Sequence, residues 1–223
     1  MLIASNVRWA FNSLALYQDG FARYRVAEST GLSDGELREV ARQIRDYFNS
    51  REEWLDVRVT RAGFSLHLYN DREVRHMRDV KGLVRALYRV QEGALLYLAV
   101  FVVAGLFARG RPFAQRLRRL ALAGSTLTAG LVVGVGLVTV VAFGPLFRLF
   151  HEVSFRNDLW QLDPATSYLV RMFPFGFWLQ ATLVIGGAAL VEAGAMAGAV
   201  WGAQWWRQWR RRVVRHKAPE RAP

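Results

Sequence analysis

The chain has no cysteine among its 223 residues. This absence excludes a thiol nucleophile, a structural disulfide and a metal site built from thiolates. The sequence also lacks a phosphate-binding P-loop and a His-x-x-x-His pair. Histidines and carboxylates are among the reactive side chains that remain.

Acidic residues are absent, or nearly so, from two short segments. Arg109–Arg119 holds five arginines and no acid, and the segment from Arg207 to the end holds seven basic residues and one glutamate. Elsewhere the signs balance, with 15 basic and 13 acidic residues in positions 1–92 and three of each in 144–177. Each basic segment lies beside a long apolar run. This is the positive-inside pattern of a multi-pass membrane protein, and it does not indicate a nucleic-acid partner.

A bilayer core of about 30 Å requires roughly 20 apolar residues per spanning helix. The chain has three apolar runs near or above this length, at Gly93–Ala108, Leu120–Phe143 and Phe175–Ala203. The first is short, so we expect it to extend through Arg89–Glu92, whose polar ends snorkel to the interface. The fold class predicted is a mainly α membrane protein, with a small α+β extracytoplasmic head on a bundle of three transmembrane helices.

The charge pattern sets the predicted boundaries and orientation, because the two basic segments belong in the cytoplasm. The predicted parts are a head outside the membrane at 1–91, a transmembrane bundle at 92–204 with spans at about 92–108, 120–143 and 175–203, an outer loop at 144–174, and a basic cytoplasmic tail at 205–223.

The first residues do not explain how such a head is exported. Met1–Ser13 has too few consecutive apolar residues for a signal peptide or a spanning helix. We therefore expect an additional membrane helix upstream, which would raise the number of spans to four. The alternative is an inverted topology.

The head contains clear local signals. Ser33 followed by Glu36 predicts a capped helix over Asp34–Asn49, whose apolar residues recur at helical spacing. Val57–Tyr69 partly alternates around a central glycine, which indicates a hairpin. Asn70 or Asp71 is expected to cap a helix that continues into the first apolar run.

Glu73, His76 and Asp79 are three residues apart at the start of that helix. Residues i and i+3 share a helix face, so either carboxylate can meet the imidazole, fix its tautomer and raise its basicity. Such an arrangement suits a general base. The alternative is a surface helix with alternating charges, since arginines lie alongside.

A second candidate site follows the second apolar run. His151 comes first, and an aromatic-rich loop with Asn157, Trp160 and Asp163 follows it. A lone histidine at an interface is often structural, but the predicted topology places His151 and His76 on the same outer face. We expect both to face outward near the surface, in a cleft lined by aromatic side chains.

Glu192 lies inside the last apolar run. Because a carboxylate at mid-bilayer costs about 2.5–3.5 kcal/mol, it should face the bundle or a polar cavity. The sequence leaves open whether Glu192 has a functional role or pairs with a neighbouring helix.

Two stretches resemble a known family. The first is acid-x-x-His-x-x-Asp-Val-Lys over Glu73–Lys81, and the second runs from Phe150 to Trp178 with Phe-His, Trp, Pro, Phe-Pro and Phe-Trp elements. Together with the order of head and helices, they resemble the lipoprotein intramolecular transacylases of bacterial membranes. Members have four spanning helices, in agreement with the expected upstream helix.

This resemblance implies a reaction and its partners. The sn-2 acyl chain of a diacylglyceryl-cysteine lipoprotein would move to the α-amino group of the same cysteine. His76 and His151 would share the proton transfers, supported by Glu73, Asp79, Asn157, Trp160 and Asp163. The reaction needs no cofactor and no metal. The partners would be a membrane-anchored lipoprotein and phospholipid in the bacterial cytoplasmic membrane, and the oligomeric state stays open.

Two other functions compete. The first is a metal-dependent membrane hydrolase, with Glu73, His76, Asp79 and His151 as nitrogen and oxygen ligands for zinc or iron. The second is a non-enzymatic protein, either a transporter subunit with Glu192 on the path or a scaffold whose head binds partners.

Overall fold

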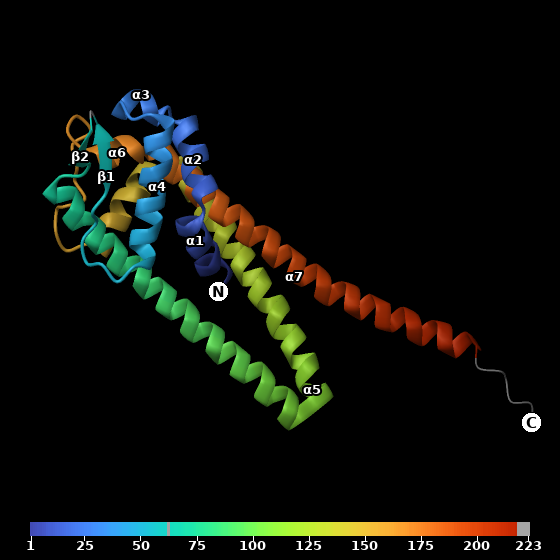
Figure 1. Cartoon of the computed structure of the whole chain (residues 1–223). Coiled ribbons are helices and arrows are strands. Elements are labelled where there is room, and N and C mark those ends of the chain that lie inside the picture. The colour runs from blue at the N-terminus through green and yellow to red at the C-terminus, as the bar shows by residue number, and fades with distance from the viewer. Residues whose placement is uncertain (62, 218–223) are drawn as a thin grey trace, which may run out of the picture.

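The computed structural model describes residues 1–61 and 63–217. Helices α1–α4, the hairpin and α6 gather at one end, and the long helices α5 and α7 extend away from them (Figure 1). The elements in chain order are α1 (Leu2–Asn12), α2 (Leu14–Arg23), α3 (Val26–Thr30), α4 (Asp34–Asn49), β1 (Arg58–Arg61), β2 (Phe64–His67), α5 (Asp71–Ser154), α6 (Tyr168–Met172) and α7 (Phe175–Lys217).

The local signals of the head are confirmed. The Ser33 hydroxyl accepts from the Glu36 amide, and the Glu36 carboxylate accepts from the Ser33 amide, so α4 begins with a full capping box. Its apolar face is buried, with Val40 and Ala41 fully enclosed. The strands β1 and β2 pair in antiparallel register across a glycine with positive φ, Gly63.

Helix α5 begins with a second capping box, between Asn70 and Glu73, and runs 84 residues. It turns back on itself at Gly110, where φ is 52° and ψ is −125°, a conformation open only to glycine. The ring of Phe113 packs against Gly105 so closely that a Cβ there would lie 2.1 Å from it. The basic segment predicted between the first two runs therefore forms this turn and the helix after it, so both ends of α5 reach the head (Figure 1).

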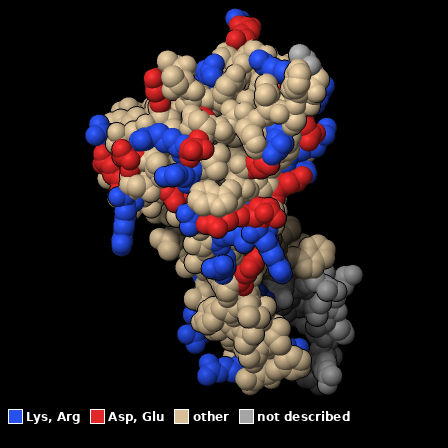
Figure 2. Space-filling view, turned by 60° about the vertical axis from the view of Figure 1, so that its left-hand side comes forward, with Lys and Arg blue, Asp and Glu red and all other residues tan. Residues whose placement is uncertain are grey.

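The long helices keep their apolar surface exposed. Two helices of the described chain are long and apolar enough to cross a membrane, α5 and Phe175–Trp206 of α7, and their most apolar windows are only 17% and 11% buried. The turn at Gly110 divides α5 into a first arm before it and a second arm after it. The three predicted apolar runs lie on these two arms and on α7. Figure 2 shows a stem with few charges below a head that carries both signs, with basic side chains at the far end. A stem of this kind needs lipid around it.

The N-terminal helix α1 packs against α7 and the first arm of α5. Its Asn6 amide donates to a Glu192 carboxylate oxygen at 2.8 Å, and the Gln91 amide donates to the Ser5 hydroxyl at 2.8 Å. The predicted need of Glu192 for a polar neighbour is met by α1, although its side chain remains exposed.

One hydrophobic core joins the head to the stem. Phe173, just before α7, and Phe177, in its first turn, pack against Tyr17 and Phe21 of α2. Met172 of α6 is fully buried in this core. The C-terminal part of the predicted outer loop, with Leu169, Met172 and Phe173, therefore belongs to the core of the head.

The basic tail predicted at 205–223 lies mostly outside the described side chains. Its backbone continues α7 as far as Lys217, and the basic side chains from Arg207 onward lie outside the described residues.

Candidate active site

The two histidines of interest lie at opposite ends of the same helix. His76 is in the second turn of α5, and His151 is in the last turn. Because α5 folds back at Gly110, the rings meet with centroids 6.1 Å apart and planes 29° apart. The structure thus brings together two side chains that are 75 positions apart in the sequence.

Aromatic rings enclose the pair. Phe155 lies 5.3 Å from the His76 centroid and 5.6 Å from that of His151, and Trp160 and Phe150 lie 5.2 and 5.3 Å from His151. His76 is 6% exposed and His151 8%. The expectation that both histidines lie near the surface is wrong for this conformation, because aromatic side chains enclose the two rings.

The hydrogen bonds differ between the two imidazoles. Nδ1 of His151 lies 2.7 Å from the backbone carbonyl of Phe147. A carbonyl only accepts, so this nitrogen carries the proton and Nε2 is left free to accept one. Nδ1 of His76 is enclosed and has no partner among the described residues.

Burial favours the neutral form of both histidines. Burial lowers the pKa of His76 to about 4, helped by the nearby His151 and opposed by Asp79. Burial also lowers the pKa of His151, and the hydrogen bond to the Phe147 carbonyl opposes this shift. At neutral pH the site therefore holds two uncharged imidazoles, of which His151 has the better-supported cationic form.

Glu73 does not orient His76 as predicted. It is 1% exposed, and one of its oxygens accepts from the Asn70 amide at 2.8 Å. The other accepts from the Ser167 hydroxyl and the Leu169 amide, each at 2.7 Å. A carboxylate at the third position of a helix turns back toward the N-terminus, away from the residue one turn ahead. Glu73 therefore joins the start of α5 to the start of α6.

Asp79, Asn157 and Asp163 act on the loop that covers the site. The Asn157 amide donates to Asp79 at 2.8 Å, which ties the loop to α5. Asp79 also opposes the lowering of the His76 pKa, although it makes no hydrogen bond with that ring. The Asp163 carboxylate accepts from the Ala165 amide at 2.9 Å and contacts neither histidine, so it belongs to a turn.

The family model described as "Lipoprotein intramolecular transacylase Lit" matches residues 1–178. The chain belongs to this family. The resemblance seen in the two sequence stretches is thereby confirmed.

Family members of known structure share the fold. The chain is similar to the membrane-integral transacylase Lit from Bacillus cereus, with a TM-score of 0.73 and 18% identity over 95% of this chain and 91% of that chain. Two histidine-substituted variants of that protein match with TM-scores of 0.68 and 0.66 at 17% and 16% identity. An uncharacterized protein from Aquifex aeolicus (strain VF5) is 26% identical over 117 residues, which are 52% of this chain and 49% of that protein. The chain thus spans about half the length of this relative.

The donor set expected for a metal does not assemble in this family member. Both carboxylate oxygens of Glu73 are held by other groups, and Asp79 is bound to Asn157. The described part of the chain contains no group of three or more such side chains placed to share an ion. The residues present do not fit the proposed metal ligation.

Two contributors to the site around the histidines were missed in the sequence. The Phe147 carbonyl lies one helical turn before His151, so the i to i+4 spacing was a signal for it. Ser167, which is 1% exposed, joins the cap of α6 to Glu73 through a tertiary contact that no local pattern indicates.

Proposed function

We propose that this protein transfers the sn-2 acyl chain of a diacylglyceryl-cysteine lipoprotein to the α-amino group of that cysteine. The main support for this proposal is the pair of neutral imidazoles, whose ring centroids lie 6.1 Å apart among aromatic side chains. Membership of a transacylase family supports acyl transfer as the reaction class. The product would be an N-acylated lyso-lipoprotein.

The reaction moves one proton from nitrogen to oxygen overall. The amine attacks the sn-2 ester carbonyl, a carbon–nitrogen bond forms, and the carbon–oxygen bond to the glycerol breaks. One imidazole takes the proton from the attacking nitrogen, the other gives a proton to the departing glycerol oxygen, and proton transfer from the first ring to the second restores both neutral forms. The acyl group passes directly from the ester oxygen to the amine of the same molecule, so the reaction requires no group carrier.

The hydrogen bonds favour His151 as the base. Its Nε2 is free, and the Phe147 carbonyl stabilises the imidazolium formed when Nε2 accepts a proton. His76, whose pKa burial lowers to about 4, stays neutral and suits hydrogen-bond donation from its N–H to the developing charge on the glycerol oxygen. Exclusion of water by Phe155 and Trp160 would favour aminolysis over hydrolysis of the ester.

We propose that the head and the site face outside the bacterial cytoplasmic membrane. The arginines of Arg109–Arg119 lie at the turn of α5, at the end of the stem opposite the histidines. A cytoplasmic position for this basic turn places the histidines at the outer surface, where the ester of an exported lipoprotein lies.

Mass spectrometry of lipoprotein N-termini tests this function in cells. A bacterium without such an enzyme should gain N-acylated lyso-lipoprotein when it expresses the chain. His67→Ala is a matched control, because this side chain is 62% exposed at the end of β2 and pairs with Asp56, just before β1. Unchanged diacylglyceryl N-termini in cells that hold the folded protein in the membrane would contradict the proposal.

A further inference from the structure

A cavity of about 200 Å³ lies between α1, the end of α4 and the first arm of α5. Three arginines line it, Arg8, Arg85 and Arg89, and Glu92 is its single acid. It is separate from the histidine site. Arg85 is nine residues beyond His76 on the same helix, which places it roughly 14 Å along the axis and on the opposite face.

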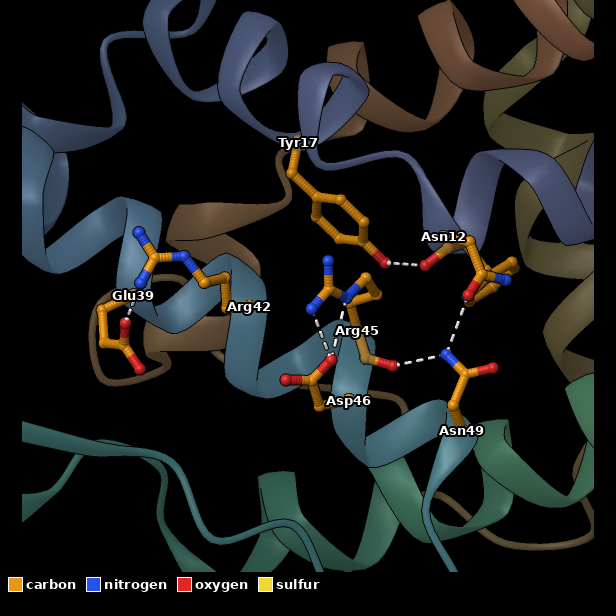
Figure 3. A network of polar contacts seen from close by, with 8 residues as sticks. Asn12, Tyr17, Glu39, Arg42, Arg45, Asp46 and Asn49 are labelled. Carbon is orange, nitrogen blue, oxygen red and sulfur yellow. Dashed lines mark hydrogen bonds and ion pairs between the residues drawn. The ribbon is translucent and has the colours of Figure 1, made fainter.

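Side-chain amides hold the wall of this cavity in place. The Asn49 amide donates to the Asn12 side-chain oxygen at 2.8 Å, which fixes the end of α4 to the end of α1 (Figure 3). The Asn12 amide donates to the Tyr88 hydroxyl at 3.2 Å, and the Arg85 guanidinium donates to the Ser50 carbonyl. The cavity is therefore formed by three elements that are bonded to one another.

Positive charge in the cavity is only partly neutralised. Arg8 pairs with Glu92 at 2.7 Å, and its guanidinium carbon lies 4.6 Å from the centroid of the Tyr88 ring. The protein partner of Arg85 is a neutral carbonyl, and Arg89 is exposed without a hydrogen bond or ion pair to any described residue. Three arginines against one glutamate leave a charge of +2 (3 − 1) around the cavity.

The position of the cavity matches the level of lipid headgroups. Arg89 and Glu92 come directly before the apolar run that starts at Gly93, and the exposed side chains of Leu95 and Leu96 follow within a turn. Trp9, next to Arg8 on α1, is 50% exposed, as interfacial tryptophans are. Charged groups at this point of a membrane helix lie among phosphates.

We propose that this arginine pocket binds the phosphate of an anionic phospholipid whose acyl chains lie along the apolar run below. Arginine presents paired N–H donors that match phosphate oxygens, and Arg89 and Arg85 have donors available. The bound lipid would hold the first arm of α5 and α1 at a fixed depth. The site is independent of the acyl-transfer chemistry, because it lies on the other face of α5.

Lipid titration of the purified full chain, followed by native mass spectrometry, tests the pocket. The probe is dihexanoyl phosphatidylglycerol below its micelle concentration. The double variant Arg85→Gln and Arg89→Gln should weaken binding by about tenfold or more, since two charge-assisted contacts are lost. Arg38→Gln removes the same kind of charge from an exposed site on α4 and should leave binding unchanged.

A gain-of-affinity variant keeps the test independent of folding defects. Glu92→Gln removes the single acid and frees Arg8, so binding should tighten several-fold. Weaker binding in this variant would overturn the proposal, as would equal losses in the double variant and in Arg38→Gln. Equal binding of dioctanoylglycerol would show that phosphate is not recognised, and equal binding of glycerol phosphate would show that the ligand is not a lipid.

Discussion

Replacement of Glu73 by alanine should destabilise the protein before it affects any chemical step. The carboxylate is 1% exposed and accepts three hydrogen bonds, from Asn70, Ser167 and Leu169. Each buried donor left without a partner costs about 1–3 kcal/mol, so the loss of all three bonds should cost roughly 3–9 kcal/mol. For a chain of this size, about 2–4 °C in Tm corresponds to each kcal/mol, so the Tm should fall by at least about 6 °C.

Thermal unfolding in one detergent, compared across a set of variants, measures this effect. Ser167→Ala should cost only about 1 kcal/mol, because Glu73 keeps its two amide donors. The two changes should be strongly non-additive, since they share one hydrogen bond. Glu39→Ala, at an exposed ion pair with Arg42 on α4, is the control and should leave the Tm within about 2 °C.

The result that refutes this reasoning is a clean separation of stability from activity. If Glu73→Ala keeps the wild-type Tm but abolishes acyl transfer, the carboxylate orients His76 after all, in a conformation different from the one described.

Three further predictions concern the pKa of His76, the contact between Asp79 and Asn157, and the membrane topology. Burial lowers the pKa of His76 from 6.5 to about 4, so the unfolded chain takes up more protons than the folded chain as the pH falls through this window. The free energy of unfolding should therefore drop by up to about 3 kcal/mol between pH 6.5 and 4. His76→Gln should remove this drop when unfolding is measured as a function of pH. Asp79→Ala should lower the His76 pKa further in NMR titration and reduce turnover several-fold, whereas Asn157→Ala should reduce turnover without lowering that pKa. A Gln115→Cys variant should resist a membrane-impermeant thiol reagent in intact cells, and labelling from outside would show an inverted topology.

The sequence predicted the elements that depend on local or periodic signals. The helix Asp34–Asn49, its Ser33 cap and the hairpin are as predicted, because capping and alternation act over a few residues. The pairing of His76 with His151 was predicted from topology, since positive-inside charge places both histidines at the same end of the stem. The family was also predicted correctly.

The errors concern contacts between distant segments. The spacing allowed either Glu73 or Asp79 to meet His76, but Glu73 bonds instead to Ser167 and Leu169, which are 94 and 96 positions away. The burial of the histidines depends on how Phe155 and Trp160 pack against them. Both aromatic residues follow the last turn of α5, so helical periodicity does not predict where their side chains lie. No local pattern contains either contact.

The most direct test of the central claim is acyl transfer by the purified protein on a synthetic diacylglyceryl-cysteine peptide, followed by mass spectrometry. His76→Ala and His151→Ala should each reduce turnover by at least about 100-fold, and the double variant should be little worse than either, because the two imidazoles act in one proton transfer. His67→Ala should match the wild type. Full activity in either single variant, with the folded state intact, would contradict the two-histidine mechanism.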